Sequence, residues 1–201
     1  MNIGIFGGSF NPPHKGHLVA AKAFFEKAKL DSLIITVAGR PPHKELDLKC
    51  SDADRLEMTR LGFLPMGNKA TVSDMEITRQ GKSYTFDTLN QLKELYPDDK
   101  LFLYCGSDML TSFKKWYRYG DILKMCTLCV MKRADLVPDW EQSLTELEKE
   151  APNGIIVIDA PHYEESSTAI REALEKGLEP MGLVDEVYDY IKNRRLYFAR
   201  S

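Results

Sequence analysis

Hydrophobic residues along this chain fall into short runs separated by longer segments with helical spacing. Runs typical of buried strands lie near 2–6, 33–38, 70–76, 101–105, 127–131 and 154–158. Between most of them, apolar positions recur every three or four residues, as in helices that bury one face. This alternation predicts an α/β protein with a Rossmann-like, doubly wound and mostly parallel sheet, covered by helices on both faces.

Capping signals place the predicted helices. One begins at Gly16, and another opens at Ser51 and ends near Gly62 or Pro65. The others are expected over 85–95, 140–149, 166–175 and 183–193. Repeats and long linkers are absent from the sequence. We therefore expect a single domain over 1–201, with 166–201 as its closing C-terminal helical segment.

The segment GGSFNPPHKGH over 7–17 is the most informative part of the sequence. Gly7 and Gly8 lack a Cβ atom, so a ligand can approach the backbone. His14 and His17 stand three apart where a helix begins, and a helix N-terminus offers unpaired N–H groups and partial positive charge. Because imidazole titrates near neutral pH, both rings can donate to phosphate oxygens. The segment predicts a phosphate site.

In a doubly wound sheet, ligands bind outside the carboxyl ends of the strands, where the strand order reverses. The loops after the first, second, fourth and sixth predicted strands should open on that edge. The sequence does not match two other phosphate-binding motifs. The glycines do not form Gly-x-Gly-x-x-Gly, and Gly81-Lys82-Ser83 lacks the first glycine of a P-loop, because residue 76 is Glu. We interpret 81–83 as an ordinary loop.

The segment Gly-Ser-Phe-Asn-Pro-Pro-His-Lys-Gly-His resembles the signature of the nucleotidylyltransferase superfamily. Its wording is closest to the bacterial nicotinate mononucleotide adenylyltransferases. Ordered matches follow at 40–44 (RPPHK), 84–89 (YTFDTL), 106–108 (GSD), Trp116 and 166–171 (SSTAIR). The likeness runs from residue 3 to about residue 198, which is essentially the whole chain.

The resemblance implies transfer of the adenylyl group of ATP to nicotinate mononucleotide, giving nicotinate adenine dinucleotide and pyrophosphate in NAD biosynthesis. It implies catalytic roles for His14, His17, Lys44 and Arg171. For ATP binding it implies Gly7, Gly8, Ser9, Phe10, His14, His17, Gly106, Asp108, Ser167, Thr168 and Arg171. For mononucleotide binding it implies Asn11, Lys44, Thr85, Trp116, Tyr117 and Arg133. Mg²⁺ is expected to arrive with ATP, held by phosphate and water rather than by a protein cage.

The sequence departs from the family pattern at two places. Glu165 precedes the Ser-Ser-Thr motif where isoleucine is usual, which should affect packing only. Arg133-Ala134-Asp135 stands where Arg-Pro-Gly is common, so the resemblance leaves the loop after the fifth strand, and the role of Arg133, open.

Each assignment has a simpler alternative. The two histidines could be structural, 166–171 could be a plain helix cap, Trp116 could be core, and Lys44 and Asp108 could be solvated. The acceptor could be nicotinamide mononucleotide or another phosphorylated molecule, as in a pantetheine-phosphate adenylyltransferase or a cytidylyltransferase. A nucleotide-sensing module without turnover is the alternative from another class.

The composition and charge of the chain limit the kinds of partner that it is expected to bind. Hydrophobic residues make up 43% and charged residues 28%, and the formal net charge of -3 argues against a nucleic-acid partner. The sequence has no apolar run of about 20 residues and no signal-peptide layout, which predicts no membrane partner and a cytoplasmic location. Whether copies form a homo-oligomer is left open.

The cysteines stand at 50, 105, 126 and 129. Cys126 and Cys129 have the spacing of a redox or metal pair, yet they lie on a predicted strand, which turns them to opposite faces. We expect buried, inert thiols. A zinc site on His14 and His17 is disfavoured, because the loop offers no further cysteine or histidine to complete it.

Overall fold

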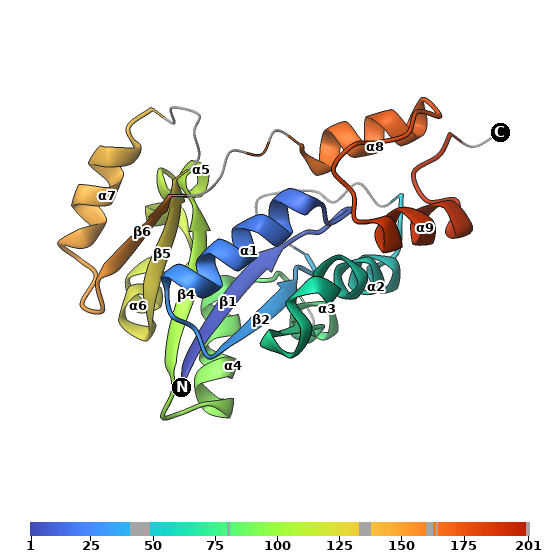
Figure 1. Cartoon of the computed structure of the whole chain (residues 1–201). Coiled ribbons are helices and arrows are strands. Elements are labelled where there is room, and N and C mark those ends of the chain that lie inside the picture. Colours follow the sequence, from blue (N-terminus) through green and yellow to red (C-terminus); the bar gives the residue numbers. More distant parts are fainter. Residues whose placement is uncertain (41–48, 80, 133–137, 160–162, 164, 200–201) are drawn as a thin grey trace.

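The computed structural model describes residues 1–40, 49–79, 81–132, 138–159, 163 and 165–199. It contains a six-stranded, all-parallel sheet in the order β3-β2-β1-β4-β5-β6 (Figure 1). The strands are β1 (Asn2–Gly8), β2 (Ser32–Val37), β3 (Ala70–Ser73), β4 (Lys100–Gly106), β5 (Cys126–Lys132) and β6 (Ile155–Asp159). This is the order of a doubly wound Rossmann-type sheet, so the predicted fold class is confirmed.

The helices occupy the crossovers and the C-terminal part of the chain. They are α1 (Lys15–Lys27), α2 (Asp52–Phe63), α3 (Met75–Thr78), α4 (Thr85–Leu95), α5 (Ser107–Leu110), α6 (Tyr119–Met125), α7 (Trp140–Glu148), α8 (Ser167–Glu175) and α9 (Asp185–Arg194). Two 3₁₀ segments, η1 (Leu64–Lys69) and η2 (Phe113–Lys115), complete the described elements.

Most elements lie where the sequence predicts them, but the third strand is shorter and the short helices α3, α5 and α6 were not predicted. The third strand ends at Ser73 rather than near residue 76, because the chain turns into α3 there. The Ser73 hydroxyl accepts a hydrogen bond from the Met75 N–H at 3.3 Å and so starts that turn. The helix α6 begins after Arg118, whose φ of 56° breaks the chain direction.

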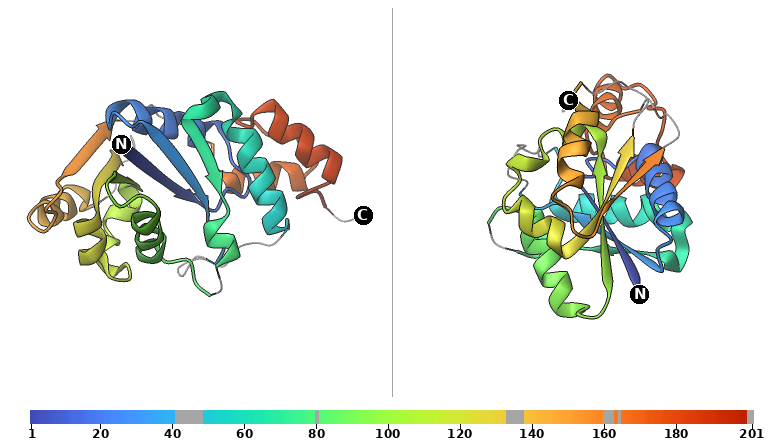
Figure 2. Two further views of the ribbon diagram at one scale, coloured as in Figure 1. Left: turned by 90° about the horizontal axis from the view of Figure 1, so that it is seen from below. Right: turned by 90° about the vertical axis from the view of Figure 1, so that its left-hand side faces the viewer.

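Helices cover both faces of the sheet, as expected (Figure 2). The core on one face joins the strands to α4, α6 and α7, and the core on the other face joins them to α1. Cys126 belongs to the first core and Cys129 to the second, as the strand period predicts.

A third core connects the C-terminal helices to α2. Met58 on α2 packs with Leu174 on α8 and with Ile191 on α9. Asp54 reinforces this junction, because its carboxylate accepts hydrogen bonds from the Tyr190 hydroxyl at 2.9 Å and the Arg194 guanidinium at 3.2 Å. Burial raises the pKa of Asp54, but these bonds and those from Ser51 outweigh it, and the pKa is lowered overall. The C-terminal helices are therefore packed onto the sheet domain through α2.

The strand order indicates where on the sheet a ligand can bind. The chain leaves β1 toward β2 on one side, and β4 lies on the other side of β1. The carboxyl ends of β1 and β4 therefore form the switch point, where a crevice is expected. The β1–α1 loop (residues 9–14) lies at this edge.

We predict that Leu174→Ala lowers the free energy of unfolding by about 2–5 kcal/mol, because it opens a cavity in the third core. Leu174 is 0% exposed, whereas Leu178, in the turn after α8, is 59% exposed. Leu178→Ala is the matched control and should leave stability within about 0.5 kcal/mol of the parent. Urea denaturation followed by circular dichroism measures both. Equal stabilities of the two variants would contradict the packing of α8 described above.

Candidate active site

The two histidines of the β1–α1 loop segment lie together, as predicted. Their ring centroids are 3.8 Å apart. His14 occupies the N-cap position of α1, and its backbone N–H donates to Nδ1 of His17 at 3.2 Å. Because Nδ1 accepts this bond, neutral His17 carries its proton on Nε2. His17 can thus donate from Nε2 beside the N-terminus of α1.

Gly16 makes room for this pair. A Cβ atom at position 16 would lie 2.9 Å from Nδ1 of His14 and 2.9 Å from a ring carbon of Tyr163. The glycine between the histidines is therefore required by the close approach of these rings.

The Phe10 side chain packs into the core beneath the β1–α1 loop. Its ring is 1% exposed and lies 5.1 Å from the His17 ring, between centroids, in an edge contact. It also packs against Phe6 and Phe63. A Cβ atom on Gly8 would lie 2.7 Å from this ring, so the second glycine lets Phe10 fold beneath the loop.

The late Ser-Ser-Thr motif meets the β1–α1 loop at the start of α8. The Ser167 hydroxyl donates to the carbonyl of Pro12 at 2.8 Å, and Nη1 of Arg171 donates to the carbonyl of Asn11 at 2.8 Å. Ser166 caps α8 by accepting from the Ala169 N–H at 3.2 Å. The cap and the contact with the first loop therefore coexist, and the structure brings these two distant motifs together.

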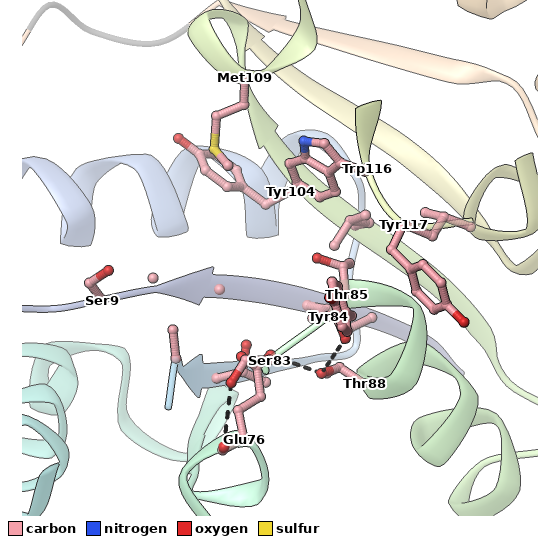
Figure 3. Close-up of a pocket in the computed structure, with 17 residues that line it drawn as sticks. Ser9, Glu76, Ser83, Tyr84, Thr85, Thr88, Tyr104, Met109, Trp116 and Tyr117 are labelled. Carbon is pink, nitrogen blue, oxygen red and sulfur yellow. Dashed lines mark hydrogen bonds between the residues drawn. The ribbon is translucent and has the colours of Figure 1, made fainter. Parts of the chain in front are cut away.

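A pocket of about 270 Å³ opens at the ends of β1 and β2, beside the entry of α4 (Figure 3). Its wall is largely apolar, with hydroxyl groups and one carboxyl group at its lower side in the view. It includes six of the predicted site residues: Gly7, Gly8, Ser9, Thr85, Trp116 and Tyr117.

Aromatic side chains frame this pocket. Trp116 packs on Phe113, with ring centroids 4.9 Å apart and an interplanar angle of 33°. Tyr117 is 51% exposed and lies 4.7 Å from the Tyr84 ring, between centroids. Trp116 therefore presents a ring to the pocket while its other contacts fix it in place (Figure 3).

Sequence reasoning missed the polar side of the pocket. Glu76 accepts a hydrogen bond from the Thr88 hydroxyl at 2.9 Å, and burial raises the pKa of this carboxyl group above its usual range. The Ser83 hydroxyl accepts from the N–H groups of Gly39 at 3.2 Å and Arg40 at 3.1 Å. The segment 81–83 is a loop, as expected. Its serine fixes the chain after β2, a contact that the short motif could not reveal.

The remaining predicted residues are placed as follows. Gly106 ends β4 at the carboxyl edge of the sheet, and Asp108 lies in α5, directly after it, where it is exposed. Thr168 lies 3.4 Å from Nη2 of Arg171, measured from its Oγ1. The Asn11 side chain turns away from the pocket, with its Oδ1 accepting from the Tyr197 hydroxyl at 2.6 Å. Lys44 and Arg133 lie outside the described residues.

The cysteines are buried, as expected from the sequence. All four cysteines are free and buried, and burial raises the pKa of Cys129 to about 12. Among the described residues, no group of three or more His, Cys, Asp or Glu side chains could hold a metal ion. None of the helices in the described ranges is long and apolar enough to cross a bilayer.

Comparisons with known proteins show which family this chain resembles. A cytidylyltransferase-like family model matches residues 5–173. The chain is 40% identical over 197 residues to a protein of Carboxydothermus hydrogenoformans named "Probable nicotinate-nucleotide adenylyltransferase", covering 97% of each chain. It is 35% identical over 196 residues to the nicotinate-nucleotide adenylyltransferase of Bacillus subtilis, again covering 97% of each.

The fold has solved counterparts. A Plasmodium falciparum nicotinic acid mononucleotide adenylyltransferase complexed with NaAD superposes with a TM-score of 0.78 at 21% identity, covering 98% of this chain and 97% of that one. The same enzyme complexed with APC gives a TM-score of 0.76. These structures show the same fold, while the nearly full-length sequence matches at 35% and 40% identity show the family. This chain belongs to the nicotinate-nucleotide adenylyltransferases, within the cytidylyltransferase-like family.

Proposed function

We propose that this protein transfers the adenylyl group of ATP to nicotinate mononucleotide, giving nicotinate adenine dinucleotide and pyrophosphate. The observation that carries the proposal is the position of one short segment, residues 7–14. Its first part lines a pocket with an aromatic wall, and its last part lies against His17 and the start of α8. One segment thus borders both a ring-binding pocket and a phosphate-binding helix terminus.

The reaction requires alignment more than acid–base chemistry. The 5′-phosphate oxygen of the mononucleotide forms a bond to the α-phosphorus of ATP, and the bond from that phosphorus to the bridging oxygen of pyrophosphate breaks. Pyrophosphate leaves with the electron pair. A phosphate dianion is already a nucleophile at neutral pH, so the protein has to orient two polyanions and stabilise the charge that develops.

The described residues supply suitable donors. We assign His17, through Nε2, to the α-phosphate, and His14 to neighbouring phosphate oxygens. Ser167, Thr168 and the N–H groups at the start of α8 are assigned to the β- and γ-phosphates, with the Arg171 guanidinium one turn further along. Gly7, Gly8, Ser9 and Phe10 shape the loop that carries ATP, and Gly106 with Asp108 borders it at β4.

The pocket is assigned to the pyridine ring of the mononucleotide. Trp116 offers a stacking face, while Thr85 and the backbone at Tyr117 offer donors for the ring carboxylate. The Glu76 carboxyl group lines the same pocket, where its Oε1 accepts the hydrogen bond from Thr88, so the preference for nicotinate is assigned to the donors alone. These features support nicotinate over nicotinamide. The mononucleotide roles of Asn11, Lys44 and Arg133, and the catalytic role of Lys44, stay predictions.

Mg²⁺ enters this proposal bound to ATP. Because the described residues hold no cluster of three ligands, phosphate oxygens and water would supply most of its coordination, with the exposed Asp108 carboxylate as a protein contact. When bound, the ion neutralises charge on the triphosphate. We further propose that the protein works in the cytoplasm on small nucleotides, without a nucleic-acid or membrane partner. Homo-oligomer formation stays a prediction.

The activity is tested by a substrate panel monitored through pyrophosphate release. Nicotinate mononucleotide, nicotinamide mononucleotide and phosphopantetheine are each supplied with ATP and Mg²⁺. We expect the highest kcat/KM with nicotinate mononucleotide and a product with the mass of nicotinate adenine dinucleotide. Pyrophosphate release with phosphopantetheine alone, or none with any acceptor, would refute the proposal.

His17→Ala is expected to lower kcat by about 10²-fold or more, because it removes a donor aimed at charge that develops in the transition state. Lys22→Ala is the control, since Lys22 is an exposed residue of the same helix. Steady-state pyrophosphate release measures both variants, and circular dichroism establishes that both are folded. A His17→Ala enzyme with parental turnover would remove His17 from the mechanism.

Trp116→Ala is expected to raise the KM for nicotinate mononucleotide about tenfold or more while the KM for ATP stays within about twofold, because the lost ring stacks on only one substrate. Initial rates with each substrate varied in turn separate the two constants. If both constants rise together, Trp116 acts by packing on Phe113 rather than as a ring platform.

A further inference from the structure

Side chains from four separate segments donate hydrogen bonds to the β1–α1 loop. Ser167 and Arg171 come from α8 and are already assigned to the triphosphate. Arg55, on α2, donates from Nη1 to the carbonyl of Ser9 at 2.8 Å. The remaining two donors, Cys50 before α2 and Tyr197 after α9, belong to no substrate site described above.

Tyr197 ends in a small buried polar cluster. Its hydroxyl donates to Oδ1 of Asn11 at 2.6 Å, and Sγ of Cys50 lies 3.1 Å from the same oxygen and 3.0 Å from the hydroxyl. Asn11, Cys50 and Tyr197 are all nearly inaccessible, with exposed fractions of 5%, 6% and 2%. Burial raises the pKa of Tyr197 and of Cys50, so the phenol is a neutral donor near neutral pH.

The backbone around Tyr197 is held in an unfavourable conformation. Arg195 has a φ of 52° and Tyr197 a φ of 67°, both in the left-handed region that bulky side chains rarely adopt. These two residues turn the chain after α9 so that the phenol ring returns to the third core. Such strain persists only where the surrounding contacts determine the conformation, and it is often found where a side chain has to be aimed.

We propose that Tyr197 is a positioning residue for adenylyl transfer, acting through Asn11 on Arg171. The Asn11 side chain is held by the Tyr197 hydroxyl, and the Asn11 carbonyl accepts from Nη1 of Arg171 at 2.8 Å. One residue of the loop is therefore fixed from two sides. Without the phenol hydroxyl, the Asn11 side chain keeps only the weaker bond from the Cys50 thiol. Asn11 is then held less firmly, and its carbonyl is a less fixed acceptor for Arg171.

This inference rests on the proposed function. It predicts that the kinetic constants for ATP change and that the KM for the mononucleotide does not. Arg171 is assigned to the triphosphate, whereas the pyridine ring is assigned to the Trp116 pocket, whose lining does not include Asn11 or Tyr197. On this inference Asn11 acts through Arg171, in place of the mononucleotide role that the resemblance implies for it. Loss of the hydroxyl should therefore lower kcat and weaken ATP, and leave the KM for the mononucleotide unchanged.

The test compares Tyr197→Phe with Tyr190→Phe. Tyr190 also loses one hydroxyl bond, to Asp54, but that bond joins α9 to α2 and does not reach the loop. We expect Tyr197→Phe to lower kcat/KM for ATP about tenfold or more, with the KM for nicotinate mononucleotide within twofold. Tyr190→Phe should keep parental kinetics at a temperature where circular dichroism shows both variants folded. Combined with Arg171→Lys, Tyr197→Phe should add little further loss, because both changes act on one unit.

Each result of these measurements either supports or overturns the role of Tyr197 as a positioning residue. Equal kinetics of the two phenylalanine variants, or full additivity with Arg171→Lys, would overturn the inference. If Tyr197→Phe does not fold, Asn11→Ser replaces it, since the shorter side chain cannot reach the phenol. A loss of kcat with unchanged mononucleotide KM then supports the inference, and parental rates or a raised mononucleotide KM overturns it. An inactive parent enzyme would refute the proposed function instead.

Discussion

The site depends on hydrogen bonds from side chains to the backbone of one loop. Three carbonyl groups of the β1–α1 loop, those of Ser9, Asn11 and Pro12, accept from Arg55, Arg171 and Ser167 at 2.8 Å each. Two prolines in this loop have no N–H group to donate, so the loop cannot build a regular ladder of its own. Its shape is therefore imposed by elements that lie 46 to 160 residues away along the chain.

The sheet makes this arrangement possible. Because the six strands are parallel, the carboxyl ends of β1, β2 and β4 share one edge, where Gly7 lies opposite Thr36 of β2 and Gly8 opposite Val37. The third core then holds α8 and α9 against α2, so that Ser167, Arg171 and Tyr197 approach the same edge from outside the sheet. The C-terminal helices thus complete the site as well as the fold.

The sequence predicts the local part of this design well. Strand and helix positions follow from apolar periodicity and from caps such as Ser51 and Ser166, which act within three residues. The pairing of His14 and His17 follows from their spacing. The bond from Tyr197 to Asn11 spans 186 residues, and the roles of Ser83 and Glu76 arise from contacts with β2 and α4. No short motif encodes such contacts, because they exist only once the parallel sheet has brought the segments together.

The chemistry explains why so many bonds converge on a loop of six residues. When the nucleophile is a phosphate that needs no activation, catalysis depends on holding two substrates in line, and a displacement of about 1 Å can cost on the order of 10²-fold in rate.

One of the side chains that hold the loop in place, that of Arg55, is a buried charge. Its side chain is 1% exposed, and its charge is balanced by Asp52, which lies 2.6 Å away between Nη2 and Oδ1 and is itself half exposed. Burying a guanidinium beneath a loop costs free energy unless its bonds are well formed. The bond to the Ser9 carbonyl is therefore best understood as part of what keeps the loop rigid where ATP and the mononucleotide have to meet.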